Sequence, residues 1–169
     1  FLFAIGDFNG WQMTYGAIMN RTPDYQRYWI EINDIEVGQP YRFQYHIMPD
    51  DIRVADAYAE IQLDKWNDPW IPESTYPDII PYPSEFTSSD PVSVFITGED
   101  EYPWNDTDFE RPQQENLVIY EILVRDFSEQ RTYKMIEDSL NYLESLGISA
   151  IELMPVMEFN GNDSWGYNT

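Results

Sequence analysis

Four residues combine ring faces or amide groups with positions at turns, where a ligand could reach them. Asn9 and Trp11 belong to the hexapeptide GDFNGW at residues 6–11, whose glycines and asparagine favour a tight turn. Trp165 and Tyr167 close a polar loop near the end of the sequence. A ring face beside an amide suits a neutral polyhydroxyl ligand, because stacking and hydrogen bonding can act together. The alternative for Trp11 is packing into the core of its own or a neighbouring domain, and for Tyr167 it is packing within its loop.

Two glutamates could supply acid–base or nucleophilic chemistry. Glu121 and Glu152 each lie inside an apolar run that is typical of a strand. A carboxylate buried in a strand must find a partner or shift its pKa, and a shifted pKa is also what a catalytic pair of carboxylates requires. From the residues alone, a structural role and a catalytic role are both open.

Candidate metal ligands are few. Asn160, Asn162 and Asp163 could give oxygen ligands to Ca²⁺, and three such donors on one loop are also ordinary turn chemistry. His46 is the only histidine, and we expect it to be structural because it lies on a strand-like pattern. The absence of cysteine excludes disulfides, thiolate metal sites and cysteine nucleophiles. We therefore expect no metal site and no cofactor, with Ca²⁺ as the single alternative.

Charge and hydropathy exclude two classes of partner. The net charge of −22 argues against nucleic acid, which needs a basic surface. A solvated acidic surface is one interpretation of that charge, and acidity together with 17% aromatic residues also suits a neutral glycan. No apolar run approaches the roughly 20 residues that cross a membrane. Residues 1–5 lack the basic start of a signal peptide and resemble the second half of a strand, which leaves the compartment open.

The elements that would position the later residues are clearest in the last third of the chain. Residues 117–124 and 148–156 are near-continuous apolar runs, typical of strands buried on both faces of a parallel sheet. Between them, Thr132 is suited to begin a helix and Gly147 to end it. The apolar stripe of that helix comprises Ile136, Leu140, Leu143 and Leu146. The pattern predicts a strand–helix–strand unit with parallel strands, which cannot close a core alone.

The first part of the chain predicts an all-β domain. Short strand-like runs separated by turn residues favour a small antiparallel sandwich. These runs are residues 1–5, 28–32, 41–47 and 92–97, with weaker ones at 17–19 and 61–63. In residues 41–47 bulky apolar residues alternate with polar ones, as in a half-buried strand. Residues 65–112 are rich in proline and aromatic residues, and we expect an irregular, packed segment there.

The turn at residues 6–11 resembles the GxFNxW turn of carbohydrate-binding module family 48, a sandwich found ahead of many starch- and glycogen-acting enzymes. Residues 53–59, RVADAYA, resemble the structural xxADPYA segment of that family, with Ala57 in place of the usual proline. The resemblance implies that Trp11 and Asn9 contact a glycan. Glycan-binding members carry a second ring-stacking tryptophan in the hairpin matching residues 41–54, and this sequence has none there.

The last third resembles the opening of the catalytic barrel in glycoside hydrolase family 13, the α-amylase family. The matching stretches are NLVIYE at 116–121, VRDFS at 124–128, LGISAIELMPV at 146–156 and WGY at 165–167. The VRDFS wording points toward branching enzymes, isoamylases and pullulanases.

The two resemblances together imply a multidomain chain. Residues 1–97 would form an all-β immunoglobulin-like sandwich, and residues 98–115 a connector rich in proline and aromatic residues. Residues 116–169 would supply the first strand, helix and second strand of a truncated (β/α)₈ barrel.

The implied function is that of the N-terminal part of an α-glucan-acting glycoside hydrolase or transglycosidase with a retaining, double-displacement mechanism. In the family the catalytic acids lie on later strands, so Glu121 and Glu152 would not be catalytic and this chain alone would be inactive. Tyr167 would line the subsite of the scissile glucose, with Trp165 beside it. The partner would be an α-glucan polysaccharide or oligosaccharide.

Two other classes of function remain as alternatives. The first is a non-catalytic starch- or glycogen-binding or docking module, for which Trp11 would be the anchor. The second is an acidic interaction protein without sugar chemistry.

Overall fold

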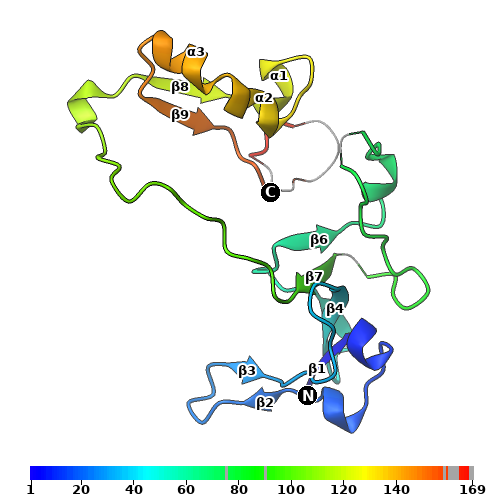
Figure 1. Cartoon of the computed structure of the whole chain (residues 1–169). Helices are drawn as coiled ribbons and strands as arrows, with labels where there is room; N and C mark the ends of the chain where they lie inside the picture. Colours follow the sequence, from blue (N-terminus) through cyan, green and yellow to red (C-terminus); the bar gives the residue numbers. More distant parts are fainter. Residues whose placement is uncertain (75, 90, 158, 160–163, 168–169) are drawn as a thin grey trace. The chain divides into compact units, whose positions relative to one another are not determined.

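The structure is a computed structural model that describes residues 1–74, 76–89, 91–157, 159 and 164–167. The chain divides into two compact units, Phe1–Glu101 and Tyr102–Thr169 (Figure 1). The boundary falls inside the connector predicted at 98–115, while the finer division into domains 1–97 and 116–169 stays a prediction. Within the described ranges, no helix has both the length and the apolar character needed to cross a membrane.

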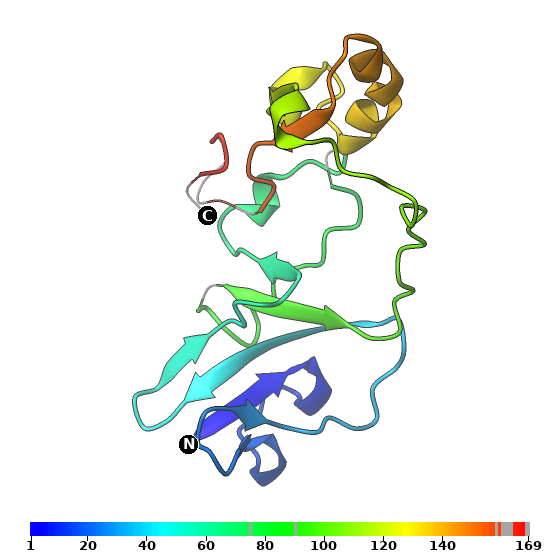
Figure 2. The same ribbon diagram turned by 90° about the vertical axis from the view of Figure 1, so that its left-hand side faces the viewer.

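The first unit is built around one antiparallel sheet with the strand order β1–β4–β7–β6, in which β5 also pairs with β4. The bounds are β1 (Leu2–Gly6), β4 (Pro40–Ile47), β5 (Ile52–Val54), β6 (Ile61–Leu63) and β7 (Val92–Ile96). Figure 2 shows the long strand β4 running between β1 and β7. One half of β4 pairs with β7 and the other with β5, while β1 covers its opposite edge. The predicted strands at 1–5, 41–47, 61–63 and 92–97 are therefore confirmed.

Short elements complete the first unit. The strands β2 (Asn20–Arg21) and β3 (Tyr28–Trp29) form a separate antiparallel ribbon. Single-turn 3-10 helices occupy Asp7–Asn9, Tyr15–Ala17 and Asp68–Trp70. Of the weak strand predicted at 17–19, only an isolated antiparallel bridge between Ile18 and Phe3 is present, and Ala17 ends a 3-10 turn instead. The unit is all-β as predicted, and its immunoglobulin-like arrangement stays a prediction.

The burial of the side chains of β4 differs from the alternation of buried and exposed residues that the sequence predicts for residues 41–47. Gln44 and His46 are buried rather than turned to solvent. The Gln44 amide donates to the backbone oxygen of Ser89 at 2.5 Å and accepts from the Thr87 hydroxyl at 3.0 Å. His46 Nε2 lies 2.6 Å from Asp51 Oδ1. A distant segment thus supplies the polar partners of the buried Gln44, which the local pattern could not indicate, whereas the partner of His46 comes from the turn after β4.

The second unit contains the expected parallel strand pair. Its elements are β8 (Ile119–Ile122), α1 (Val124–Phe127), α2 (Tyr133–Asp138), α3 (Leu140–Ser145) and β9 (Ala150–Leu153), preceded by a 3-10 turn at Gln114–Asn116. β8 and β9 are parallel, with Ile119 opposite Ala150. Thr132 begins α2, since its side chain accepts a hydrogen bond from the Met135 N–H at 3.3 Å. Gly147 follows α3 with a φ of 83°, a left-handed conformation that favours glycine.

Two expectations for the second unit need correction. The single predicted helix is divided at Ser139, whose hydroxyl donates to the Met135 carbonyl at 2.7 Å, a contact that bends helices. Ile136 and Leu143 are buried on Ile122, whereas Leu140 and Leu146 are exposed. The strands are not buried on both faces, because the helices cover only the face that carries Ile122.

Candidate functional site

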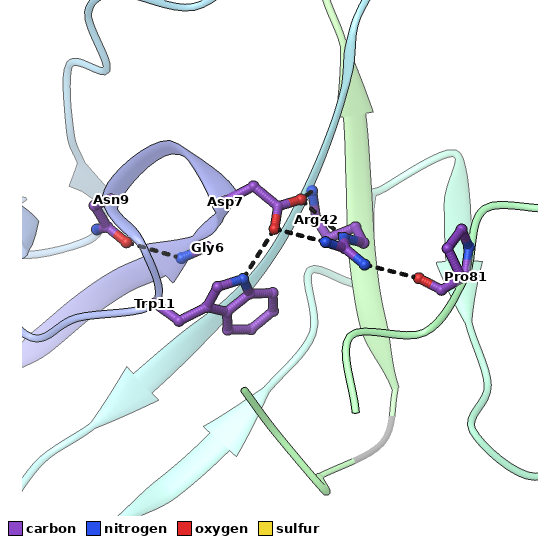
Figure 3. A network of polar contacts seen from close by, with 6 residues as sticks. All are labelled: Gly6, Asp7, Asn9, Trp11, Arg42 and Pro81. Carbon is purple, nitrogen blue, oxygen red and sulfur yellow. Dashed lines mark hydrogen bonds and ion pairs between the residues drawn. The ribbon is translucent and has the colours of Figure 1, made fainter. Parts of the chain in front are cut away.

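The turn at residues 6–11 is held by its own asparagine. Asn9 Oδ1 accepts from the Gly6 N–H at 3.0 Å, as Figure 3 shows. Asn9 Nδ2 donates to the Ala4 carbonyl at 2.9 Å. Gly6 is required for space, since a Cβ there would lie 2.4 Å from the backbone oxygen of Arg42. Both ends of the Asn9 amide therefore serve the turn, and its contact with sugar hydroxyls stays a prediction.

Asp7 connects this turn to β4 through Arg42. Arg42 donates from Nε to Asp7 Oδ2 at 2.9 Å and from Nη2 to Oδ1 at 3.0 Å, a two-bond contact between guanidinium and carboxylate. The Arg42 backbone N–H donates to the same Oδ2 at 2.9 Å. Arg42 Nη1 also donates to the Pro81 carbonyl at 3.0 Å, as Figure 3 shows. Burial raises the pKa of the Asp7 carboxyl, but the hydrogen bonds from Arg42 and Trp11 and the Arg42 charge outweigh it, so that this pKa lies below its ordinary value.

Trp11 completes this network and is buried. Its indole Nε1 donates to Asp7 Oδ1 at 3.0 Å. Its ring is stacked on Phe86, with centroids 5.8 Å apart and planes 6° from parallel. Only 7% of Trp11 is exposed, and it packs with Ile5, Val92 and other residues of the core. These contacts support the alternative in which Trp11 packs into the core of its own domain.

The residues missing from the sequence interpretation of this turn are Asp7, Arg42 and Phe86. The Asp7–Arg42 contact joins positions 35 residues apart, and no local pattern links them. Phe86 lies in the proline-rich segment, where the sequence predicted packing without indicating a partner. The contacts of this turn therefore connect β1, β4 and the proline-rich segment.

Tyr167 lies beside the carboxyl end of β8. Its hydroxyl donates to Glu121 Oε1 at 3.1 Å, and 64% of the residue is exposed. The hydrogen bond to Glu121, burial, and the charges of Glu121 and Glu152 raise the pKa of Tyr167. Trp165 is also exposed, and Arg125 Nη1 donates to the Ser164 carbonyl at 3.2 Å, which ties the loop to α1.

Gly166 sets the close approach of this loop to the chain after β9. Its φ is 91°, and a Cβ there would lie 2.5 Å from the Pro155 carbonyl oxygen. A side chain at this position would be strained and would collide with the backbone. Gly166 therefore fixes the backbone between Trp165 and Tyr167.

The two strand glutamates differ from the expectation of burial. Glu121 and Glu152 are opposite one another in the β8–β9 register, and both are exposed. They need no buried partner, because one face of this strand pair has no covering layer among the described residues of the unit. Asn160, Asn162 and Asp163, the predicted calcium ligands, lie outside the described residues, and the rest of the structure shows no group of three His, Cys, Asp or Glu that could hold a metal ion.

Several curated proteins are similar to the chain. Malto-oligosyltrehalose trehalohydrolase of Saccharolobus solfataricus is 35% identical over 120 residues, which is 70% of this chain and 19% of that protein. The chloroplastic isoamylase 1 of Arabidopsis thaliana is 38% identical over 81 residues, 43% of this chain and 10% of that protein. The trehalohydrolase of Deinococcus radiodurans is 36% identical over 67 residues, 40% of this chain and 11% of that protein. The chain thus spans about a fifth or less of these relatives.

A solved structure has the same fold over nearly the whole chain. A candidate α-amylase from Salmonella typhimurium superposes with a TM-score of 0.61 and 22% identity, covering 98% of this chain and 23% of that one. At this identity the match supports the fold alone. No family model matches the chain. The relatives and the fold together show that the chain belongs to the α-amylase family, glycoside hydrolase family 13, and corresponds to an N-terminal region of it.

Proposed function

We propose that the chain is part of an enzyme that cleaves or transfers α-glucans at α-1,4 or α-1,6 glucosidic bonds. The observation that carries this proposal is the parallel pair β8–β9, joined through helices, with Tyr167 held on Glu121 near the strands' carboxyl ends. In a (β/α)₈ barrel, that end of the strands carries the active site. The relatives, a malto-oligosyltrehalose trehalohydrolase and an isoamylase, support the same class of substrate.

In this proposal the two units have separate roles. The first, all-β unit is a companion module like those of carbohydrate-binding family 48, and its GDFNGW turn supports that assignment. The second unit supplies the first strand, helix segment and second strand of the barrel. The barrel's remaining strands, with the catalytic acids, belong to the rest of the whole protein.

The chemistry proposed for the whole protein is retaining double displacement. A carboxylate attacks the anomeric carbon and forms a covalent glycosyl ester, while a carboxylic acid gives its proton to the leaving oxygen. Water then attacks the same carbon, gives a proton to the deprotonated acid and displaces the carboxylate, which breaks the ester. Tyr167 contributes a ring face beside the scissile sugar, where a π-face favours the positive charge of an oxocarbenium-like transition state. Trp165 extends this aromatic wall. Glu121 is a positioning residue, which fixes the Tyr167 hydroxyl. No metal or cofactor is part of this proposal.

Release of reducing sugar tests the proposal. The full-length protein and the 169-residue chain are incubated with amylopectin and with pullulan. We expect activity from the full-length protein and none from the chain alone, because a barrel of about 250 residues is needed to assemble the site. Activity of the isolated chain would contradict the assignment of the catalytic acids to the rest of the protein, and an inactive full-length protein would contradict the enzyme proposal itself.

A second candidate function is a non-catalytic α-glucan-binding or docking module. The observation that favours it is the exposure of aromatic side chains in the first unit, Trp66 and Trp70 among them. The buried Trp11 does not support the anchor that the sequence suggested for such a module. Glycan binding by a full-length protein that hydrolyses no glycan would identify this function.

A further inference from the structure

A short turn after β6 presents two tryptophans to solvent. Trp66 is 67% exposed and Trp70 is 77% exposed. The strand before the turn ends at Leu63, which is buried in the core, so the turn begins from a fixed point. Single exposed apolar residues are common on protein surfaces, but large aromatic side chains that gather on one ordered turn indicate an interaction site.

Asp64 holds the turn in one conformation. Its Oδ1 accepts from the backbone N–H of Trp66 at 2.6 Å and of Asn67 at 3.0 Å, and its Oδ2 accepts from Asn67 Nδ2 at 2.5 Å. Asp68 Oδ2 accepts from the Asp64 N–H at 2.8 Å. Burial raises the pKa of Asp64, but the hydrogen bonds from Trp66 and Asn67 bring it below its ordinary value. The carboxylate is therefore ionised at neutral pH and keeps these bonds.

Backbone hydrogen bonds hold the whole segment from Asp64 to Trp70 in one ordered turn. The Asp68 N–H donates to the Asp64 carbonyl at 3.2 Å, and the Trp70 N–H donates to the Asn67 carbonyl at 2.9 Å, as in a turn of helix. The last of these bonds joins positions three apart, as in the 3-10 helix Asp68–Trp70, so that Trp66 and Trp70 are carried at the two ends of one short ordered segment. Lys65 Nζ lies 5.0 Å from the centre of the Trp66 ring, a cation–π contact that restricts the ring.

The chemistry of this surface fits a neutral sugar chain. Two exposed rings on one short turn can each stack on the C–H face of a sugar unit, and a polymer of glucose offers several such faces. The net charge of −22 disfavours anionic polymers. Since the rings are mounted on a hydrogen-bonded turn, little conformational freedom is lost when they bind.

We propose that Trp66 and Trp70 form a non-catalytic α-glucan-binding surface that holds polymeric substrate. This inference rests on the proposed function, because that function supplies the class of ligand. The surface is distinct from the turn at residues 6–11, whose Trp11 is covered by Phe86. It also lies in the unit that carries none of the residues proposed to contact the scissile sugar.

Affinity electrophoresis of the full-length protein through gels containing amylopectin tests this inference. The double variant Trp66→Ala/Trp70→Ala is compared with wild type and with Trp104→Ala. Trp104 is a matched control, since it is 73% exposed and lies outside the turn. We expect wild type and Trp104→Ala to be retarded equally and the double variant to bind at least about tenfold more weakly, as the loss of two stacked rings implies. The variant Trp66→Phe/Trp70→Phe keeps two ring faces and should retain part of the retardation.

The outcomes separate this inference from the proposed function. Equal retardation of the double variant and wild type, or no retardation of wild type, would overturn the glucan-binding surface. Hydrolysis of amylopectin by wild type is measured in parallel, and its absence would overturn the enzyme proposal whatever the gels show. If the double variant changes its oligomeric state in size-exclusion chromatography with light scattering, while retardation is unchanged, the turn binds a second copy of the chain instead of a sugar.

Discussion

Two turns of the first unit carry tryptophans and place them in opposite environments. In the turn at residues 6–11, the indole N–H of Trp11 donates a hydrogen bond to Asp7 and the indole ring stacks on Phe86. In the turn that starts at Asp64, the carboxylate binds the backbone and leaves Trp66 and Trp70 in solvent. Both turns are well hydrogen-bonded, so turn geometry does not decide whether an aromatic residue is available to a ligand. Whether the aromatic ring is available depends on whether another segment of the chain packs against it.

Replacing Trp11 by alanine should produce the largest loss of stability. Removal of a buried, stacked indole leaves a cavity and takes one of the two hydrogen bonds from Asp7 Oδ1, and such large-to-small changes cost about 3–5 kcal/mol. The free energy of unfolding is obtained from urea titrations followed by far-UV circular dichroism, with Trp104→Ala as the control. A loss below about 1 kcal/mol would show that Trp11 is not part of the core and would remove the contrast between the turns.

Asp7→Asn should cost less, about 2 kcal/mol, which is the range for hydrogen bonds to charged groups. The amide keeps the size of the side chain but loses the charge that Arg42 contacts through two bonds. The same urea titrations measure the effect. Asp24→Asn is a suitable control, because Asp24 is exposed and bonded to the neighbouring Thr22 instead of a distant strand. Equal losses in both variants would mean that the Asp7–Arg42 contact has no special role.

Acid should remove the stabilisation that the ionised Asp7 carboxylate gives to the turn at residues 6–11, and the Asp7→Asn variant should not show this effect. Because the pKa of Asp7 is lower in the folded than in the unfolded chain, the unfolded state binds more protons between the two values. The stabilisation is complete above about pH 4, the ordinary range of an aspartate, and is lost as pH falls through the folded-state pKa. Urea midpoints between pH 6 and pH 3 should therefore decline more steeply for wild type than for Asp7→Asn. Parallel declines would contradict this role.

Trp66→Ala and Trp70→Ala should change stability least, within about 0.5 kcal/mol of wild type, as is usual for exposed side chains. The contrast with Trp11→Ala then becomes a test of the whole comparison, since all three remove an indole from the same unit. Urea titrations of the two single variants measure it. A loss above about 2 kcal/mol in either variant would show that the turn after β6 packs as tightly as a core element.

Local patterns are sufficient to predict much of the second unit and the main strands of the first. Alternation and apolar runs predict β1, β4, β7 and the parallel β8–β9 pair, because period and turn residues act within a few positions. Thr132 and Gly147 mark the helix ends for the same reason. The break at Ser139 was missed, since a serine hydroxyl that returns to the Met135 carbonyl leaves the apolar stripe unchanged.

The environment of each candidate site residue depends on contacts that no short window contains. Burial of Trp11 requires Phe86, the position of Asp7 requires Arg42, and the buried Gln44 requires Thr87. Tyr167 meets Glu121 across 46 positions. Residue types restrict what a side chain can do, which is why aromatic residues at turns are reasonable candidates for sugar contact. Whether a ring faces solvent or the core is set by the segments that the fold brings against it, and those segments are distant in the chain.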